Sequence, residues 1–392
     1  MSRAAHPLAF IGGTSEPGGL HVHTADVALA AAASGRHVTV VCPSIDHFSP
    51  MLRGTPVQVR VVPPRDLAEP PRRYWPRVLA GLRDAVAVLC RGKLAEGCAG
   101  DLLAIRRATR RLLTIEHREV DNPALTARDL LLHGLAMRVT VYRSIAVSEA
   151  IADQARRDLR LPRRMIACCL NWYDPDFRPP TPAERVAART ALGLPLDACV
   201  IGYHGRLAPE KRVDALIEAF AAARTRTDQP LRLALIGDGW KRRELESRLH
   251  ERGIADLAVI TGWHPNPRHA LAALDISVLP SLGEGFPLGL LEAMATGIAC
   301  LAHPMSSTTR IIDPARNGRL ADLADPASFT RALLELVALG PDGRAALGRA
   351  AAADTTRDFA RAARLPAVLR ALGIELPPAM LPDRPRHLEF VR

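Results

Sequence analysis

The stretch LAFIGGTSEPGGLHVHTADVALAAAASGRHVTVVCP, residues 8–43, indicates the fold class of this chain. It reads as a short apolar strand (8–11), a glycine-rich loop (12–19), a helix (20–34) ended by glycine, and a second buried strand (37–43). A strand–helix–strand unit favours a parallel sheet with helices on both faces. The glycines lack GxGxxG spacing and no acidic residue ends the second strand, so this is no dinucleotide motif. A phosphate-binding loop and a plain tight turn both stay open for this stretch.

The proline-rich segment 171–185 divides the chain into two parts with a similar alternation of strands and helices. It holds four prolines and few apolar residues, which is typical of a linker. A chain of 392 residues is long for a single hydrophobic core, so two domains are expected. We therefore predict an α/β protein with an N-terminal domain over 1–178, a C-terminal domain over 179–358, and a C-terminal helix and tail over 359–392.

Further apolar runs in both parts read as buried strands, and helical patterns separate those of the second part. Ligands in such doubly wound, Rossmann-like sheets bind beyond the carboxyl ends of the strands. Two domains of this kind that face each other form a central cleft, and we expect the C-terminal segment to pack back across it. Strands are expected at 112–115, 139–147, 198–205, 231–237, 257–262, 275–281 and 298–303, and helices at 211–224, 241–253, 266–274, 325–338 and 359–373.

The composition is that of a globular protein, with 48% hydrophobic and 24% charged residues. No apolar run is long enough to span a bilayer. The apolar stretch at the N-terminus is too short for a signal peptide and runs into a strand. The seven cysteines are odd in number and lack metal-site spacing, which predicts free thiols in a reducing, cytoplasmic setting.

Two basic stretches of the first half stand out in a chain whose net charge is +11. AIRRATRRLL (104–113) places four arginines at helical spacing, and PRRYWPRVLAGLRD (71–84) mixes arginines with Tyr74 and Trp75. A basic, amphipathic segment that contains tryptophan can lie on an anionic bilayer, so peripheral membrane contact is one expectation. Solvated helix faces are the other interpretation, and neither stretch matches a nucleic-acid-binding module.

Three stretches of the second half carry polar residues directly after predicted strands. In HGRLAPEKRV (204–213), Arg206 and Lys211 supply two cations, which suit a diphosphate. IGDGW (236–240) is a tight glycine turn that lets a ligand approach the backbone closely. Because all three stretches follow strands, their side chains are expected to converge on one edge of the sheet.

The third stretch, SLGEGFPLGLLEAMATG (281–297), places two carboxylates around the start of a helix. Proline is favoured in the first helical turn, so the helix is expected to begin near Pro287. Glu284 then lies in the preceding loop and Glu292 about a turn and a half inside the helix. Carboxylates bind hydroxyl groups through strong charge-assisted hydrogen bonds. Together with the two cations, they predict a nucleotide sugar, in which a diphosphate joins two rings that carry hydroxyl pairs.

These motifs resemble those of retaining glycosyltransferases of the GT-B type, family 4. That family carries two glutamates separated by seven residues, with Gly-Phe-Pro or a similar run after the first, as in EGFPLGLLE (284–292). Its upstream cation pattern is similar to GRLAPEK (205–211), its glycine turn to LIGDG (235–239), and the start of its first helix to GGLHVHTADVALA (18–30). The resemblance covers most of the chain and is strongest in 198–340.

The resemblance implies a role for each matching residue. Arg206 and Lys211 would hold the donor diphosphate and stabilise charge on the leaving nucleotide. Glu284 would contact hydroxyls of the donor sugar, and Glu292 those of the ribose. His117 would complete the catalytic set near the sugar and acceptor, with a surface or core histidine as the alternative. The remaining implied donor-binding positions are Gly18, Gly19, Gly205, Gly239, Phe286, Leu288 and Gly289.

The resemblance also implies the reaction. The family transfers sugars with retention of configuration, so front-face transfer is expected, in which the leaving phosphate helps to deprotonate the acceptor. The acceptor would be a saccharide, a lipid-linked molecule or a small molecule in cell-envelope, glycolipid or natural-product biosynthesis. No metal or other tightly bound cofactor is expected, because no ligand cluster is apparent. Where the family has Asn-Gly-Val-Asp, this chain has Asn171-Trp172-Tyr173-Asp174, which leaves the acceptor open.

Two other functions stay open beside this one. A nucleotide-sugar epimerase or a phosphorylase-like enzyme would keep the fold and change the reaction, but the lysine environment of a phosphorylase cofactor is missing. A non-catalytic protein would keep only the donor site, and the intact set of charged residues argues against it. The protein is expected to be cytoplasmic, to bind no nucleic acid, and to lie at the inner face of the membrane if its acceptor is lipid-linked.

Overall fold

The computed structural model describes residues 6–12, 18–44, 48–66, 68–92, 99–119, 125–264, 267–377 and 380–382. Contacts between residues group the chain into two compact units. Unit 1 is the chain up to Asn171 together with the segment from Ala362, and unit 2 is Trp172–Arg361. The chain therefore passes between the units twice, and the first passage lies seven residues before the boundary expected at 178/179.

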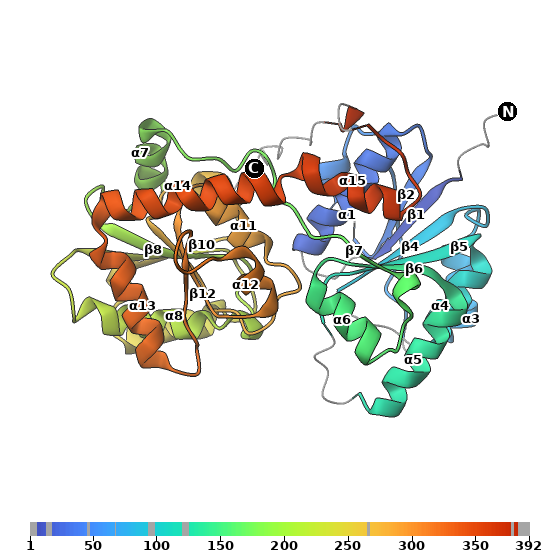
Figure 1. Ribbon diagram of the computed structural model, residues 1–392, viewed down its shortest axis with the longest axis horizontal. Helices are drawn as coiled ribbons and strands as arrows, with labels where there is room; N and C mark the ends of the chain where they lie inside the picture. The colour runs from blue at the N-terminus through green and yellow to red at the C-terminus, as the bar shows by residue number, and fades with distance from the viewer. Residues whose placement is uncertain are drawn as a thin grey trace. The chain divides into compact units, whose positions relative to one another are not determined.

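Unit 1 contains a parallel sheet with the strand order β3-β2-β1-β4-β5-β6-β7. Helices α1 and α15 cover one face of the sheet, and α3, α4, α5 and α6 cover the other (Figure 1). The strands are β1 Leu8–Gly12, β2 Val38–Cys42, β3 Gln58–Val61, β4 Val86–Arg91, β5 Arg111–Glu116, β6 Val141–Ala146 and β7 Ile166–Cys168. The helices are α1 Gly19–Ala33, α2 Ser49–Leu52, α3 Pro71–Val78, α4 Ala99–Ala108, α5 Ala127–Thr140, α6 Glu149–Arg157 and α15 Arg361–Ala371, with a 3₁₀ turn at Arg163–Met165.

Unit 2 contains a second parallel sheet with the order β10-β9-β8-β11-β12-β13. Its strands are β8 Cys199–His204, β9 Leu231–Ile236, β10 Ala258–Gly262, β11 Ile276–Leu279, β12 Ala299–Ala302 and β13 Arg319–Leu320. Its helices are α7 Pro182–Ala191, α8 Val213–Arg224, α9 Arg242–Glu251, α10 Pro267–Leu271, α11 Leu288–Ala295, α12 Ser306–Ile311, α13 Pro326–Ala338 and α14 Gly340–Phe359, with 3₁₀ turns at Pro209–Lys211 and Ala255–Leu257.

Each sheet has a point where the strand order reverses, and this point locates the candidate site. In unit 2 the chain runs from β8 outward through β9 and β10, then returns to place β11 on the other side of β8. Loops that leave adjacent strands in opposite directions open a crevice at the carboxyl edge of the sheet. The predicted α/β architecture of two doubly wound sheets is confirmed.

One helix prediction of the first half is wrong. The four arginines of 104–113 do not share a helix, because α4 ends at Ala108. The backbone N–H of Arg110 already donates to the carbonyl of Ala85, and Arg111 opens β5. The Oγ1 of Thr109 donates to the carbonyl of Ile105 at 2.8 Å and closes the last helical turn. The chain therefore changes from helix to strand in the middle of the basic stretch.

The aromatic residues of the linker are buried within unit 2. Trp172 and Tyr173 are 5% and 7% exposed. The N–H of Tyr173 donates to the carbonyl of Phe359 at 3.3 Å, and its hydroxyl lies 3.2 Å from the Oγ1 of Thr356. Tyr173 thus ties the first passage between the units to the end of α14, beside the second passage.

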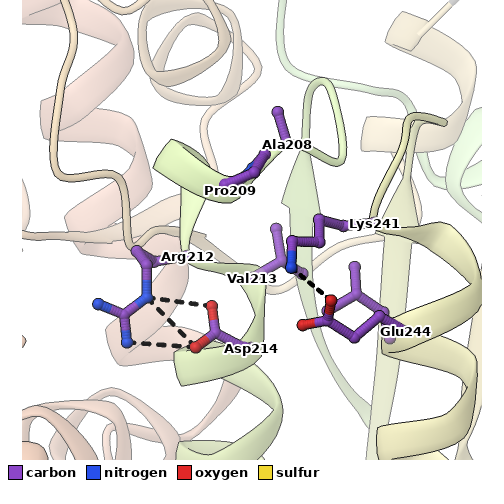
Figure 2. Close-up of a pocket in the computed structure, with 8 residues that line it drawn as sticks. Ala208, Pro209, Arg212, Val213, Asp214, Lys241 and Glu244 are labelled. Carbon is purple, nitrogen blue, oxygen red and sulfur yellow. Dashed lines mark hydrogen bonds and ion pairs between the residues drawn. The ribbon is translucent and has the colours of Figure 1, made fainter. Parts of the chain in front are cut away.

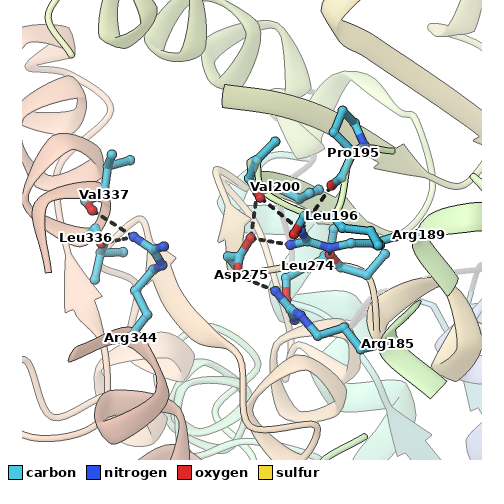
Figure 3. Close-up of polar contacts among 12 residues, drawn as sticks. Arg185, Arg189, Pro195, Leu196, Val200, Leu274, Asp275, Leu336, Val337 and Arg344 are labelled. Atoms are coloured by element: carbon cyan, nitrogen blue, oxygen red, sulfur yellow. Dashed lines mark hydrogen bonds and ion pairs between the residues drawn. The ribbon is translucent and has the colours of Figure 1, made fainter. Parts of the chain in front are cut away.

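A network of charged side chains joins α7 to the strands at the edge of the sheet opposite the crevice (Figure 3). The buried Arg189 donates from Nη2 to Oδ2 of Asp275 at 2.6 Å and also to backbone carbonyls. Arg185 binds Oδ1 of the same carboxylate. The N–H of Val200 donates to Oδ2 at 2.7 Å. Asp275 thereby connects α7 with the starts of β8 and β11.

Candidate donor site at the strand-order reversal of unit 2

Three loops meet at the carboxyl edge of the central strands of unit 2. They follow β8, β9 and β11, and backbone hydrogen bonds join them. The N–H of Leu207 donates to the carbonyl of Asp238 at 2.8 Å, and the N–H of Lys241 donates to the carbonyl of Leu207 at 3.1 Å. The N–H of Leu282 donates to the carbonyl of Glu210 at 3.0 Å. The loops therefore form one connected rim around the end of β8.

Lys211 and Glu284 form an ion pair across the crevice. The Nζ of Lys211, at the end of the 3₁₀ turn after β8, lies 2.5 Å from Oε1 of Glu284, in the loop after β11. The two side chains are 17% and 10% exposed, so the pair is mostly shielded from water. The Oγ of Ser307 donates to the carbonyl of Glu284 at 3.3 Å and holds the loop from α12. The structure thus brings together the predicted cation and the predicted carboxylate.

Arg206 lies on the same rim and is about one-third exposed, at 35%. Its Nη2 lies 2.8 Å from Oε1 of Glu210, and its guanidinium carbon lies 5.9 Å from the ring centre of Trp240. The hydroxyl of the fully buried Tyr203 donates to the carbonyl of Arg206 at 2.9 Å. Burial raises the pKa of this phenol well above its usual value, so it remains a donor at neutral pH.

The second carboxylate, Glu292, faces a histidine that the sequence analysis did not single out. The Nδ1 of His204, at the end of β8, lies 3.3 Å from Oε2 of Glu292 in α11. Burial, with a smaller contribution from His264, lowers the pKa of His204 to about 4. The ring is therefore neutral at pH 7, and the contact is not an ion pair there. Its position at the carboxyl end of the strand predicted over 198–205 was the signal that could have identified it.

The helix that carries Glu292 packs closely against the end of β8. It begins at Leu288, with Pro287 as the residue before its first turn, as the sequence predicted. A Cβ added at Gly289 would lie 3.0 Å from the carbonyl of His204, so only glycine permits this spacing without a shift. Phe286 is buried, with its ring 5.5 Å from that of Phe359. Its side chain therefore holds the loop, while the first-turn N–H groups of α11 face the loop end of the helix.

Two glycines of the turn after β9 lie against the loop after β8. Gly237 and Gly239 have φ values of +143° and +154°, which side chains of L residues rarely adopt. A Cβ on Gly237 would lie 1.9 Å from the carbonyl oxygen of Gly205, and one on Gly239 would lie 2.4 Å from that of Leu207. The LIGDG motif is therefore required by close backbone packing between two loops of the site.

Replacement of Gly237 by alanine is expected to lower the free energy of unfolding by about 3 kcal/mol or more, since backbone strain and a clash add. Gly253→Ala is the matched control. Gly253 also has positive φ, at +63°, but no described atom lies within 4 Å of an added Cβ, so only about 1 kcal/mol is expected. Urea denaturation of the two variants measures both values. Equal losses would contradict the contact between the loops.

A small pocket of about 150 Å³ lies beside the rim, between the starts of α8 and α9 (Figure 2). An ion pair lies on each side of it. The Nε of Arg212 lies 3.1 Å from Oδ1 of Asp214, and Lys241 pairs with Glu244. Arg212 and Lys241 are 40% and 35% exposed, so water screens their charges more than that of Lys211, and a phosphate would gain less from them. Its lining residues are Ala208, Pro209, Arg212, Val213, Asp214, Lys241, Glu244 and Leu245.

His117 belongs to unit 1, where it follows β5. Its N–H donates to the carbonyl of Arg91 at 3.1 Å, and its ring lies edge-on to His23 with 4.8 Å between ring centres. Burial, followed by His23 and His21, lowers the pKa of His117 well below its usual value. His117 is thus neutral at pH 7. His21 and His23, at two positions where the surface of the first helix would be expected, are buried, at 2% and 3% exposure.

A buried charged group next to His117 was not predicted. The Nε of Arg91, at the end of β4, donates to Oε2 of Glu116 at 2.8 Å, and its Nη1 lies 2.8 Å from Nε2 of His133. The side chains of Arg91 and Glu116 are 2% and 0% exposed. Burial, and then the charge of Arg91, lowers the pKa of His133 to about 3. The network holds the ends of β4 and β5, from which His117 extends.

The glycines expected to meet the pyrophosphate, Gly18 and Gly19, lie at the start of α1 and are exposed. Gly18 is the residue before the first helical turn. The rest of the glycine-rich loop, 13–17, lies outside the described residues. The approach of these glycines to a donor remains a prediction.

Stability is expected to depend on pH through His204 and His133. The folded-state pKa of each ring lies below the unfolded value of about 6.5, so the unfolded chain binds more protons below that pH. The free energy of unfolding should fall as pH drops below about 6.5, with the contribution of His204 ending near pH 4 and that of His133 near pH 3, and should be nearly flat above pH 6.5. Urea midpoints across pH 4.5–8 test this for His204→Gln, whose dependence should be shallower, with the exposed His250→Gln as control. An unchanged slope in His204→Gln would contradict the assignment.

The described residues contain neither a cluster of metal ligands nor a disulfide. No group of three or more His, Cys, Asp or Glu side chains there is placed to hold a metal ion. The sequence contains one Asp-x-Asp, Asp174-Pro175-Asp176. The Oδ1 of Asp174 accepts from the N–H of Asp176 at 3.0 Å, as in a simple turn. The six described cysteines form no disulfide, and Cys98 lies outside the described residues.

Comparison with known proteins finds a family match within the second half of the chain. Residues 198–338 match the family described as glycosyl transferases group 1. The D-inositol 3-phosphate glycosyltransferase of Stackebrandtia nassauensis is 35% identical over 173 residues, which are 41% of this chain and 39% of that protein. The alpha-D-kanosaminyltransferase of Streptomyces kanamyceticus is 30% identical over 189 residues, 47% of this chain and 48% of that protein. The chain thus spans less than half the length of these relatives.

Solved structures match nearly the whole chain in fold. HepE of Anabaena, crystallised in complex with UDP and glucose, aligns with a TM-score of 0.80 and 17% identity, covering 94% of this chain and 100% of HepE. The sucrose-phosphate synthase of Thermosynechococcus elongatus aligns with a TM-score of 0.74 and 18% identity, covering 94% and 98%. These likenesses establish the GT-B fold of the two units.

Proposed function

We propose that this chain, whose residues 198–338 form a glycosyl transferases group 1 domain, is a retaining glycosyltransferase that uses a nucleotide-diphosphate sugar. The observation that carries the proposal is the Lys211–Glu284 pair, which spans the strand-order reversal between β8 and β11 with Arg206 on the same rim. A shielded cation beside a carboxylate matches the junction between a diphosphate and a sugar.

Each charged group has a separate task in the proposed reaction. Lys211 and Arg206 bind the diphosphate oxygens and stabilise the negative charge that grows as the sugar leaves. Glu284 accepts hydrogen bonds from sugar hydroxyls, and its pairing with Lys211 fixes both groups before the donor arrives. Glu292 accepts hydrogen bonds from the ribose, and the neutral His204 beside it adds no competing charge. The N–H groups of Leu288 and Gly289 supply further donors at the start of α11.

The donor is best sought first among UDP-sugars, because HepE was crystallised with UDP and glucose and with UDP-glucose. The sequence relatives include a D-inositol 3-phosphate glycosyltransferase and a 2-deoxystreptamine glucosyltransferase, names that favour a polar acceptor for this chain. We place this chain in the biosynthesis of a cell-envelope saccharide, a glycolipid or a natural product. The leaving phosphate would deprotonate the acceptor on the same face of the sugar, which gives retention.

Thermal unfolding with UDP-, GDP-, ADP- and dTDP-sugars tests the proposal, with Arg206→Ala as the control. A ligand at 100 times its Kd adds about 2.7 kcal/mol to stability. One nucleotide class should raise the melting temperature of the wild type, and the rise should be smaller in Arg206→Ala. Absence of any shift, or an equal shift in the variant, would contradict the diphosphate site. The anomeric coupling of the product, measured by NMR, separates retention from inversion.

A further inference from the structure

Helix α5 of unit 1 exposes a stripe of aliphatic side chains. Leu131, Leu132, Leu135 and Val139 are 38%, 50%, 45% and 80% exposed. At 100° per residue they fall within roughly 100° of arc around the helix axis. Isolated exposed leucines are ordinary, but four on one face of one helix form a contiguous apolar surface.

The orientation of α5 is fixed from its opposite side. His133, Gly134 and Met137 are buried there. A Cβ on Gly134 would lie 2.1 Å from the carbonyl oxygen of Leu159, so the helix lies directly on that backbone. At the first turn Thr126 and Asp129 form a reciprocal capping box. The stripe therefore cannot turn inward without loss of these contacts.

Exposed basic side chains lie on α5 itself and on the adjacent helix α4. Arg128 and Arg138 are exposed on α5, whose one acidic residue is the Asp129 of the capping box. Helix α4 packs against α5 (Figure 1) and exposes Arg106 and Arg107. A second copy of this surface would bring like charges together, whereas an anionic lipid surface would neutralise them. The charges thus favour a bilayer over self-association.

The aromatic residues of the neighbouring basic helix α3 are not available as membrane anchors. The hydroxyl of the buried Tyr74 donates to the carbonyl of Pro63 at 2.7 Å. The Nε1 of Trp75 donates to Oδ1 of Asp101 at 2.7 Å. None of the described helices is both long and apolar enough to cross a bilayer. The apolar part of a membrane surface in unit 1 is therefore on α5 and not in 71–84.

We propose that α5 and the adjacent face of α4 dock on an anionic lipid bilayer, with the aliphatic stripe at the acyl boundary and the arginines at the headgroups. This inference deepens the proposed function and rests on it: the transferase acts on an acceptor held in that bilayer. Binding is expected to weaken as salt rises, because headgroup attraction is screened.

Co-sedimentation of the full chain with vesicles tests this surface. The vesicles contain phosphatidylcholine alone or with 30% phosphatidylglycerol, at low salt. The wild type should sediment with the anionic vesicles only. The variant Leu132→Glu/Leu135→Glu should lose at least tenfold in vesicle affinity. Val186→Glu/Leu196→Glu, which adds the same charge at exposed apolar positions of unit 2, should bind as the wild type does. Circular dichroism melting confirms that each variant is folded.

Several outcomes would overturn the inference. Equal binding by both double variants, or no wild-type binding to anionic vesicles, would contradict bilayer docking through α5. So would a change from dimer to monomer in Leu132→Glu/Leu135→Glu by analytical ultracentrifugation, because the stripe would then be an interface between copies. The nucleotide-dependent melting shift, measured on the same samples, distinguishes the two proposals. If nucleotide still raises the melting temperature but the protein does not bind vesicles, only the proposal of a bilayer surface is contradicted. If the protein binds vesicles but nucleotide does not raise the melting temperature, the proposed donor site is contradicted.

Discussion

Replacement of Lys211 by alanine is expected to lower kcat for sugar transfer by about 100- to 1,000-fold, the usual effect of removing one preorganised charge from a developing anion. The ammonium group is 17% exposed and 2.5 Å from Glu284, so water replaces it poorly. Its loss also leaves the Glu284 carboxylate without its cation, next to the negative diphosphate. Steady-state kinetics with a donor found in the nucleotide screen measure the change.

Lys241→Ala is the matched control for this prediction. It removes the same charge from the adjacent loop, but Lys241 pairs with Glu244 beside the small pocket and is 35% exposed. Its kcat should stay near that of the wild type, and both variants should keep the wild-type circular dichroism spectrum. Near-normal kcat in Lys211→Ala, or an equal loss in both variants, would contradict the placement of the diphosphate.

Replacement of Arg189 by alanine is expected to lower the free energy of unfolding of unit 2 by about 3–5 kcal/mol, as for one partner of a buried pair. The guanidinium is 2% exposed, and it holds Asp275 as well as backbone carbonyls that no water reaches. Removal of the guanidinium leaves these acceptors without a hydrogen-bond donor at the starts of β8 and β11. Urea denaturation followed by far-UV circular dichroism gives the value.

Arg185→Ala is the comparison for Arg189→Ala, because Arg185 binds the same carboxylate from a position that is 35% exposed. Arg185→Ala should lower the free energy of unfolding by no more than about 1 kcal/mol, as for a solvated ion pair. Both variants should retain nucleotide affinity, since the network lies at the edge of the sheet opposite the crevice. An equal loss of the free energy of unfolding in Arg185→Ala and Arg189→Ala would contradict the role given to the burial of Arg189.

The strands of unit 2 were predictable because a parallel sheet covered on both faces uses continuous apolar runs. Stretches such as IACLA (298–302) carry that pattern without interruption. Elements with weaker patterns were missed. Strand β3 is a partly exposed edge strand, and β7 has only three residues. Helix α14 is rich in alanine and glycine, and α5 carries leucines on both its inner and outer sides, so neither shows a clear helical stripe.

The candidate site was partly predictable for a topological reason. Lys211 and Glu284 are 73 residues apart in the chain, yet both follow strands that meet at one sheet edge. That rule locates loops, but it does not give the contacts of individual side chains. The pairing of Arg91 with Glu116 and the packing of His21 and His23 depend on how helices settle on the sheet. Such contacts have no local sequence pattern.

Hydrogen–deuterium exchange with and without the nucleotide diphosphate sugar shows whether the three loops at the strand-order reversal of unit 2 bind the donor. Slower exchange is expected at the amides of 205–207, 237–240, 286, 288 and 289, which lie on the three loops at the strand-order reversal. Exchange around the small pocket at 212–214 and on α5 should not change. A bound nucleotide that leaves the three loops unchanged and protects another region would contradict a donor site at this edge of the sheet.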